Sequence, residues 1–336
     1  MSIVMTGGGT GGHLTIIHSV KMELKKETLI YIGSTKGQDK QWFEGDESFE
    51  KTYFLETRGV VNQGFIGKIK SLFKIFTSAW EMRKILKEHH ASVVFSVGGF
   101  SSAPTAIAAK ISGVPLVIHE QNATIGSLNK LLKPVADVFI SSYIEQSPIK
   151  AYPIKQVFFD NARIRSEVKT ILFLGGSQGA KAINVLALAL APILKQRGIH
   201  IIHQAGERNI DEVKKLYHAL EIEADVFGFT TTLENSMQKA DFAIARSGAS
   251  TLWELSATAL PTLYIPYPYA ASDHQYHNAQ FLVEQNLAWL MREEEIDHNK
   301  VLALFDEDLT KVSQGLINIV ENDGSKKIAT LLQSFG

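Results

Sequence analysis

The segment SIVMTGGGTGGH (residues 2–13) opens the chain with a short apolar run that leads into a glycine-rich turn. The same arrangement returns at TILFLGGSQGA (residues 170–180). Glycines at such a turn let the backbone approach a phosphate closely, and the helix that follows points its amide groups toward the anion. Two such turns, each at the start of a series of strands and helices, predict two α/β domains and an enzyme that binds a nucleotide in one of them.

Short β-branched runs alternate with helical stretches along the whole chain. Most runs are apolar without interruption, which is typical of parallel strands that helices bury on both faces. The series is interrupted at residues 152–169, which we interpret as the interdomain linker. We expect strands at residues 3–5, 29–32, 93–97, 116–119 and 138–141, and then at 171–174, 199–204, 225–228, 242–245 and 262–265.

Composition and charge narrow the class of protein. The 336 residues are 45% apolar, which suffices for two cores, and contain no cysteine, which excludes disulfides and thiolate chemistry. Residues 1–165 carry 20 Lys and Arg against 14 Asp and Glu, whereas the remainder is acidic. The first half is therefore expected to meet an anionic partner or surface, and the net charge of −1 argues against general nucleic-acid binding. The early first strand leaves no room for a signal peptide, and no apolar run is long enough to span a membrane, so we expect a cytoplasmic protein.

The first turn matches two nucleotide motifs incompletely. Gly7, Gly9 and Gly12 have the G-x-G-x-x-G spacing of dinucleotide enzymes, but the next strand runs into Gly33-Ser34 where those enzymes carry an acid. A Walker A loop fails because His13 stands where lysine is required. A histidine at a helix N-terminus is held neutral by the helix dipole and can act as a base, and we predict that role for His13.

Polar clusters follow several of the predicted strands. Ser177 and the amides of residues 176–179 suit a phosphate at the start of the next helix. The blocks GGFSSAP (98–104), HEQN (119–122), RSGAST (246–251) and DHQ (273–275) supply further polar groups at strand ends, where ligands of open parallel sheets bind. No metal-ligand spacing is present apart from Asp306-Glu307-Asp308, which we interpret as a solvated surface, and we predict no metal and no cofactor.

These blocks, in this order along nearly the whole chain, resemble the MurG family of peptidoglycan glycosyltransferases (family 28), which add N-acetylglucosamine (GlcNAc) to the membrane-bound lipid I. The resemblance implies a GT-B fold, in which two Rossmann-like α/β domains with parallel sheets face each other across a cleft. It implies an acceptor and membrane domain at residues 1–158, a UDP-GlcNAc domain at 166–322, and a C-terminal helix at 323–336 that packs back on the first domain.

Carried over by position, the resemblance assigns two sets of site residues. The acceptor side would contain Gly98, Gly99 and Phe100, with His13 beside them, although the family usually has tyrosine at the position of Phe100. The donor UDP-GlcNAc would be held by Thr10, Gly11, Gly12, Asn122, Arg163, Ser177, Gln178, Gln204, Phe229, Thr230, Glu254, His274, Gln275 and Asn278. Thr10 would also face the acceptor, and either Arg163 or Arg165 could reach the diphosphate.

The expected reaction is an inverting transfer. The 4-hydroxyl of the acceptor sugar would attack the anomeric carbon of GlcNAc and form lipid II. His13 is the first choice for the general base and Glu120 the alternative, which could instead orient the sugar or the imidazole. Amides at the helix N-terminus and Ser177 would stabilise the leaving diphosphate without a cation.

An aromatic and basic stretch predicts contact with a membrane. Residues 65–80 place apolar side chains on one side of a helix, flanked by lysines, which suits anionic headgroups as well as an ordinary core-facing helix. The resemblance favours the membrane, so we expect a peripheral protein on the cytoplasmic face, with other proteins of cell-wall synthesis as further partners. The membrane face is predicted to comprise Phe65, Ile69, Phe73, Phe76, Trp80, Lys68 and Lys70.

Two other functions fit parts of the same pattern. A GT-B UDP-GlcNAc 2-epimerase would need no lipid acceptor, and the apolar face at residues 65–80 argues against it. A nucleotide-sugar-binding protein without catalysis would not need His13, Glu120 and Glu254 together.

Overall fold

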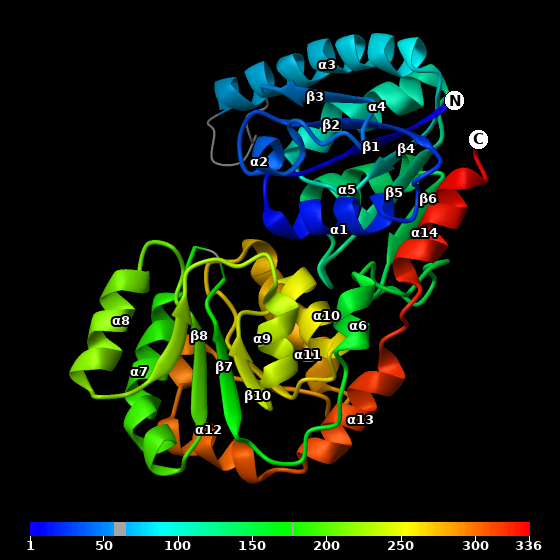
Figure 1. Cartoon of the computed structure of the whole chain (residues 1–336). Coiled ribbons are helices and arrows are strands. Elements are labelled where there is room, and N and C mark those ends of the chain that lie inside the picture. The colour runs from blue at the N-terminus through cyan, green and yellow to red at the C-terminus, as the bar shows by residue number, and fades with distance from the viewer. Residues whose placement is uncertain (57–64, 177) are drawn as a thin grey trace. The chain divides into compact units, whose positions relative to one another are not determined.

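The computed structural model describes residues 1–56, 65–176 and 178–336, and of residues 65–74, 76 and 100 it describes the backbone alone. The chain forms two compact units (Figure 1), one made of Met1–Ile154 with Asp323–Gly336 and the other of Lys155–Asn322. We call them unit 1 and unit 2. The division at residue 154 falls inside the predicted linker, and the C-terminal segment belongs to unit 1.

Unit 1 is built on a six-stranded parallel sheet with the strand order β3-β2-β1-β4-β5-β6. Its strands are β1 (Ser2–Thr6), β2 (Thr28–Ser34), β3 (Lys51–Leu55), β4 (Ala91–Ser96), β5 (Leu116–Glu120) and β6 (Val138–Ser141). The helices are α1 (Gly11–Lys21), α2 (Asp39–Phe43), α3 (Phe65–Glu88), α4 (Ala103–Ser112), α5 (Ser127–Leu132) and α14 (Gly324–Gln333), with the short 3₁₀ turns η1 (Phe100–Ser102) and η2 (Lys133–Val135).

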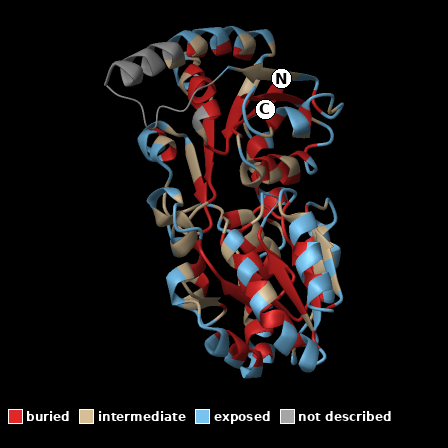
Figure 2. Cartoon of the chain, turned by 90° about the vertical axis from the view of Figure 1, so that its left-hand side faces the viewer, coloured by how far each residue is buried: buried red, intermediate tan, exposed pale blue. Residues whose placement is uncertain are grey.

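Helices cover both faces of this sheet. Helix α3 packs along α4, and α1 packs against α14. Gln333 of α14 also donates a hydrogen bond to Glu27, just before β2. The strands are therefore buried on both sides, as their apolar sequences require, and Figure 2 shows them as buried ribbons between helices with exposed outer surfaces.

Unit 2 repeats the architecture with the strand order β12-β11-β10-β7-β8-β9, again parallel throughout. Its strands are β7 (Thr170–Leu174), β8 (His200–Gln204), β9 (Ala224–Phe227), β10 (Phe242–Ala245), β11 (Thr262–Tyr264) and β12 (Trp289–Leu290). Its helices are α6 (Gln156–Asp160), α7 (Lys181–Gln196), α8 (Ile210–Ala219), α9 (Leu233–Lys239), α10 (Ala249–Ala257), α11 (His274–Val283), α12 (His298–Ala303) and α13 (Leu309–Ile319), with η3 (Ala271–Asp273), η4 (Glu293–Glu295) and η5 (Leu304–Asp306).

Helix α7 illustrates why these segments fold as they do. Its buried side chains recur three and four residues apart and form one apolar stripe over the sheet. They are Ile183, Leu186, Ala187, Leu190, Ala191 and Leu194, all part of the core of unit 2.

All ten predicted strands are present, and the part of the chain that the structure describes contains two more that were not predicted. Both missed strands, β3 and β12, lie at the edge of a sheet, and their residues are exposed or half-buried. An edge strand has a neighbour on one side only, so its sequence need not be an unbroken apolar run. The first glycine-rich turn follows β1, the third strand in the order of its sheet, and the second follows β7, the fourth strand in its own.

Candidate functional site

The first glycine-rich turn, residues 7–12, interlocks with a second turn after β4. Gly7 and Gly9 have φ values of +122° and +87°, and Gly98 and Gly99 have values of +86° and +82°. A Cβ atom on Gly7 would lie 2.6 Å from the oxygen of Gly98, and one on Gly99 would lie 2.8 Å from the oxygen of Gly8. Only glycine permits this approach, so the predicted acceptor residues of these two turns are held together.

His13 lies in the first turn of α1 and has a neighbour at each ring nitrogen. Its Nδ1 is 2.9 Å from the hydroxyl of Thr10, and its Nε2 is 3.0 Å from the amide nitrogen of Gln121. The structure thus brings Thr10 and His13 together with the end of β5. Gln121 was not among the predicted site residues, although it stands between two that were, Glu120 and Asn122.

Glu120 is buried, and both of its carboxylate oxygens accept hydrogen bonds. One oxygen accepts from the backbone nitrogen of Asn122 at 3.0 Å, and the other accepts from Gly126 and from the side chain of Asn129, both at 2.9 Å. The side chain is only 2% exposed. Glu120 therefore fixes the loop that carries Gln121 and Asn122.

His119 precedes this pair and is fully buried against Tyr152. Burial lowers the pKa of His119 to about 3, with a smaller contribution from the charge of nearby His13. Neither ring nitrogen of His119 has a hydrogen-bond partner among the residues that the structure describes. The imidazole of His119 is therefore neutral throughout the physiological pH range.

An acid lies next to the first turn, but on α2 and not at the end of β2, which ends in Gly33-Ser34 as the sequence indicates. Asp39, the first residue of α2, is fully buried, and its carboxylate accepts the backbone N–H of Gly9 at 2.6 Å. In a dinucleotide enzyme the corresponding acid faces a ribose, whereas Asp39 faces the protein's own backbone. The finding strengthens the exclusion of a dinucleotide site.

The second glycine-rich turn connects β7 to α7 in unit 2. Gly176 and Gly179 both have a φ of +78°, and the nitrogen of Gly179 donates to the oxygen of Gly176 at 3.0 Å. The turn leads directly into the 16-residue helix α7, whose N-terminal amides and dipole favour an anion. Gln178 is exposed beside it, and Ser177 lies outside the described residues.

The loop after β8 packs against this turn. A Cβ atom on Gly179 would lie 2.6 Å from the oxygen of Ala205, and one on Gly206 would overlap the backbone of Gly179. Gln204, a predicted donor residue, is 5% exposed, and its carbonyl accepts the N–H of Gly175 at 3.2 Å. The side chain of Asn184 donates to the oxygen of Ala205 at 3.1 Å and so ties α7 to the same loop.

Glu254 is half-buried on α10 and carries a strongly shifted pKa. Burial raises the pKa of Glu254 to about 8; the positive charge of Lys155 opposes the shift and the negative charge of Glu234 adds to it. Because burial makes ionisation of this carboxyl unfavourable without a ligand, Glu254 is a candidate for accepting hydrogen bonds from ligand groups such as ribose hydroxyls.

The remaining donor residues lie on the loop after β9 and on α11, which follows β11. Phe229 is half-exposed just after β9, and the Thr230 hydroxyl contacts that of Thr232 at 3.1 Å. The side chain of Gln275 accepts the N–H of Tyr267 at 3.0 Å, and His274 is half-buried at the start of α11.

Asn278 is placed differently from its neighbours on α11. It is fully buried, and its amide donates to the oxygen of Ser247 at 3.1 Å. Its described contact therefore holds α11 against the turn after β10 rather than reaching solvent.

Two arginines lie at the amino-terminal ends of the unit 2 strands, opposite the end that carries the glycine-rich turn. Arg163 pairs with Asp241 at 2.7 Å and donates to backbone oxygens at the end of α9, while Asp241 accepts the N–H groups of residues 169 and 170, where β7 begins. Arg165 is 1% exposed and donates to the oxygens of Ala240, Met237 and Thr258. The structure does not bring either guanidinium together with the glycine-rich turn, which follows the other end of β7.

The predicted membrane face is described only in part. The side chains of Phe65, Lys68, Ile69, Lys70, Phe73 and Phe76 lie outside the described residues, whereas Trp80 is 57% exposed on α3. Among the described helices, none is long and apolar enough to cross a membrane.

Two further features bear on ligands. Asp306, Glu307 and Asp308 are exposed, Asp308 caps α13, and the described residues contain no cluster of three or more potential metal ligands.

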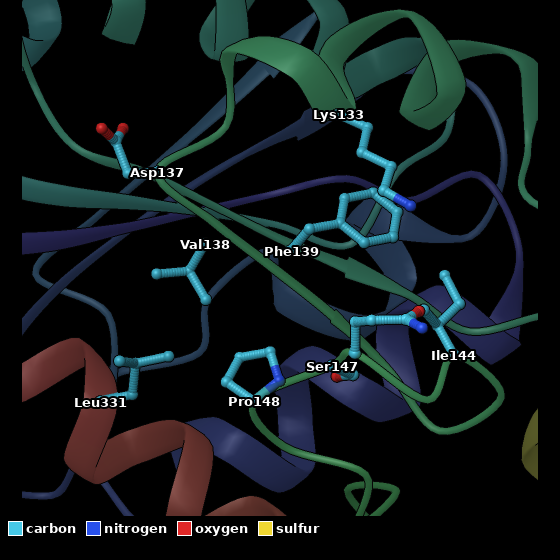
Figure 3. Close-up of a pocket in the computed structure, with 9 residues that line it drawn as sticks. Lys133, Asp137, Val138, Phe139, Ile144, Ser147, Pro148 and Leu331 are labelled. Atoms are coloured by element: carbon cyan, nitrogen blue, oxygen red, sulfur yellow. The ribbon is translucent and has the colours of Figure 1, made fainter.

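A pocket of about 600 Å³ lies beside β6 and α14 in unit 1 (Figure 3), lined in part by Phe139, Pro148 and Leu331. It contains none of the predicted site residues.

The chain matches the models of two protein families. Residues 3–140 match the glycosyltransferase family 28 N-terminal domain, and residues 170–330 match the family 28 C-terminal domain. A protein from Sulfurovum sp. (strain NBC37-1) is 70% identical over 100% of this chain and 99% of its own length; it is named UDP-N-acetylglucosamine--N-acetylmuramyl-(pentapeptide) pyrophosphoryl-undecaprenol N-acetylglucosamine transferase.

A solved structure of MurG supports the same assignment, and a second solved structure shares the fold. A crystal structure of MurG from Acinetobacter baumannii superposes with a TM-score of 0.82 at 25% identity and covers 99% of both chains. A UDP-N-acetylglucosamine 2-epimerase superposes with a TM-score of 0.63 at 14% identity, over 100% of this chain and 97% of its own, which shows a common fold alone. The two parallel α/β units are those of the GT-B fold, and the chain belongs to glycosyltransferase family 28.

Proposed function

We propose that this protein transfers GlcNAc from UDP-GlcNAc to N-acetylmuramyl-(pentapeptide) pyrophosphoryl-undecaprenol, the lipid I of peptidoglycan synthesis. The observation that carries this proposal is the 70% identity, over the full length, to a transferase of that name. The likeness to a 2-epimerase concerns the fold only, because the identity is 14%. The product is lipid II.

Unit 2 holds the donor in this proposal. The turn at residues 175–179 and the N-terminus of α7 receive the diphosphate, where amide groups and the helix dipole stabilise negative charge. Glu254 accepts hydrogen bonds from the ribose hydroxyls, and Phe229 and Thr230 flank the uracil. Gln275 and His274 serve the GlcNAc hydroxyls.

Unit 1 supplies the base. The acceptor's 4-hydroxyl oxygen attacks the anomeric carbon of GlcNAc, its proton passes to Nε2 of His13, and the bond from the anomeric carbon to the diphosphate breaks with its electron pair leaving on UDP. The 4-hydroxyl replaces the Gln121 amide as the hydrogen-bond donor to Nε2. We assign this role to His13 rather than Glu120, because both oxygens of Glu120 are already occupied by loop donors.

Charge on the leaving UDP is stabilised by the amides at the start of α7, so the proposed reaction needs no metal ion. The test measures UDP release and lipid-linked product with purified enzyme, UDP-GlcNAc and a lipid I analogue, with and without a chelator. Equal rates with chelator support this route, and chelator-sensitive turnover contradicts it.

The same assay separates the alternative functions. Omitting the lipid should abolish UDP release, whereas a 2-epimerase would convert UDP-GlcNAc to its C2 epimer without an acceptor. Binding of UDP-GlcNAc without any UDP release in the complete mixture would instead identify a nucleotide-sugar-binding protein.

The acceptor is a membrane lipid, and unit 1 carries an exposed apolar and basic surface suited to one. Trp80, with the Arg83 guanidinium 5.0 Å from its ring centre, lies on α3, which packs along α4. Lys110 at the end of α4 pairs with Asp137 at 3.0 Å and ties that end to the segment after η2. Large apolar side chains are exposed on α3, α4, α5 and η2: Trp80, Ile111, Leu131 and Val135. Three exposed lysines, Lys110, Lys130 and Lys133, lie on α4, α5 and η2.

We therefore propose that this surface rests on the anionic inner leaflet, where apolar burial and lysine charges act together. Co-sedimentation with vesicles of anionic lipid should exceed that with zwitterionic vesicles and should fall with salt. Leu131→Ser should weaken binding to anionic vesicles about tenfold. Leu216→Ser, the same substitution at an exposed leucine on α8, should leave vesicle binding unchanged. Equal binding by both variants would place the membrane surface elsewhere.

A further inference from the structure

Asp39 forms a buried hub beneath the first glycine-rich turn. Its Oδ2 accepts the N–H of Gly9 at 2.6 Å, and its Oδ1 accepts the N–H of Ser34 and the hydroxyl of Tyr31, both at 2.9 Å. The side chain is fully buried. A buried carboxylate is tolerated only where such donors surround it, so this arrangement is specific to an anionic side chain.

Tyr31 links the carboxylate to a second point of the turn. Its hydroxyl lies 2.8 Å from the oxygen of Gly7 as well as 2.9 Å from Asp39, so one hydroxyl proton bridges the two acceptors. Burial, together with the charge of Asp39, raises the pKa of the Tyr31 hydroxyl and keeps it protonated. The turn is therefore bound at Gly7 through its oxygen and at Gly9 through its nitrogen.

The surrounding backbone is shaped to admit this carboxylate. A Cβ atom on Gly8 would overlap the carboxylate of Asp39, and one on Gly33 would lie 2.6 Å from its Oδ1. Gly37, with a φ of +86°, brings the loop before α2 so close that a Cβ there would lie 2.6 Å from Cα of Gly9. The glycines in both segments thus serve the packing of Asp39 against the turn.

We propose that Asp39 is the internal anion of the first turn and a positioning residue for the transfer reaction. In phosphate-binding turns the amides face the ligand, but here the amide of Gly9 is taken by Asp39. Thr10 and His13 follow directly, and their hydrogen bond at 2.9 Å depends on where the turn leaves Gly9. Asp39 thereby sets the position of the His13 imidazole and keeps a phosphate from this amide.

This inference rests on the proposed function for its kinetic readout, and Asp39→Asn is the test. The variant keeps the shape but turns an NH₂ group toward the N–H of Gly9 or the donors at Oδ1. We expect kcat to fall about 10- to 100-fold, since small displacements of a catalytic group are that costly, while the Kd of UDP-GlcNAc stays within about twofold. Combined with His13→Ala, it should add no further loss, because it acts through His13.

Asp46→Asn is the matched control. Asp46 is also an aspartate of unit 1. It forms an ion pair with Lys21 and accepts a hydrogen bond from the backbone of Ser48, and it makes no described contact with the first glycine-rich turn. It should leave kcat within about twofold while changing the net charge equally. Additive losses in the double variant, or equal kinetics for Asp39→Asn and Asp46→Asn, would overturn the proposal.

A readout without catalysis separates this inference from the proposed function. Hydrogen exchange in the peptide that spans residues 7–13 should speed up in Asp39→Asn and not in Asp46→Asn, whether or not the enzyme uses lipid I. Unchanged exchange would overturn the positioning role, whereas a wild-type enzyme inactive on lipid I would overturn only the proposed function. If Asp39→Asn does not fold, Tyr31→Phe is measured instead, with faster exchange and a kcat lowered severalfold expected.

Discussion

The Nε2 atom of His13 lies 3.0 Å from the Nε2 atom of Gln121. An amide nitrogen donates and does not accept, so the ring Nε2 is the acceptor of this pair. The ring proton then resides on Nδ1, which faces the hydroxyl of Thr10 at 2.9 Å. With the amide in this orientation the lone pair of the ring lies at Nε2, the position that a general base requires.

Gln121→Glu tests this relationship. A carboxylate in place of the amide favours the protonated imidazole, so the acidic limb of the pH profile of kcat/KM should move to higher pH. Activity near pH 7 should fall about tenfold and recover toward the alkaline side. Gln146→Glu, an exposed glutamine of the same unit, should leave the profile in place. An unshifted profile for Gln121→Glu would argue against His13 as the base.

His13→Ala should lower kcat by roughly 10²- to 10⁴-fold, the usual contribution of general base catalysis. The Kd of UDP-GlcNAc, measured by calorimetry, should stay nearly unchanged, because the proposed donor turn belongs to unit 2. His218→Ala on α8, an exposed position, serves as the control. Weak donor binding combined with normal chemistry would mean that His13 has been assigned to the wrong substrate.

Glu254 makes the binding of UDP-GlcNAc depend on pH. Because its pKa is raised to about 8 in the unliganded protein and ribose hydroxyls donate to the ionised form, the affinity should increase as the pH rises toward 8 and level off above it. Glu254→Gln should weaken binding about 10- to 100-fold, as expected for lost hydrogen bonds to a charged group, and should remove the pH dependence. Calorimetry in buffers of different ionisation enthalpy would detect the released proton, and pH-independent binding by the wild type would refute this account.

The same shift has a consequence for stability. The folded-state pKa of Glu254 lies above its ordinary value of 4.5, so the protonated form supports folding fully below about pH 4.5, and this contribution is lost as the pH rises through about 8. Glu254→Gln should therefore raise the melting temperature relative to the wild type at pH 8 to 9 and have little effect near pH 4.5. Thermal denaturation at both pH values checks the sign.

The strands that carry the site could be predicted because their sequences are locally decisive. A run such as residues 171–174 is apolar throughout and is followed by Gly175 and Gly176, so neighbouring residues are enough to predict both the buried strand and the turn. Asp39 and Gln121 gave no such signal. Their roles depend on Gly9, which is 30 residues from Asp39, and on His13, which is 108 residues from Gln121, and periodicity says nothing about such pairs.

Arg163 and Arg165 also show that contacts between distant parts of the sequence could not be predicted from local patterns. The resemblance allows either Arg163 or Arg165 to reach the diphosphate, but Asp241 and the carbonyls of Met237, Ala240 and Thr258 surround them at the amino-terminal ends of the strands. Those acceptors come from α9, from the segment between α9 and β10, and from the residue after α10, so tertiary contacts decide whether the arginines bind a ligand or the protein's own carbonyls. Buried carbonyls that lost these donors would cost free energy, which favours the observed arrangement.

Gly206→Ala should disturb the proposed diphosphate site through its contact with Gly179. Its φ is +87°, and a Cβ atom there would overlap the backbone of Gly179, so the turn must shift as well as absorb strain. Gly198 offers the matched control, since its φ is +69° and an added Cβ meets nothing within 4 Å. Both variants should lose about 1 kcal/mol of stability from the backbone conformation, but only Gly206→Ala should also weaken UDP-GlcNAc binding, by at least about tenfold. Equal affinities for the two variants would show that the spacing between the loop after β8 and the turn after β7 does not govern donor binding.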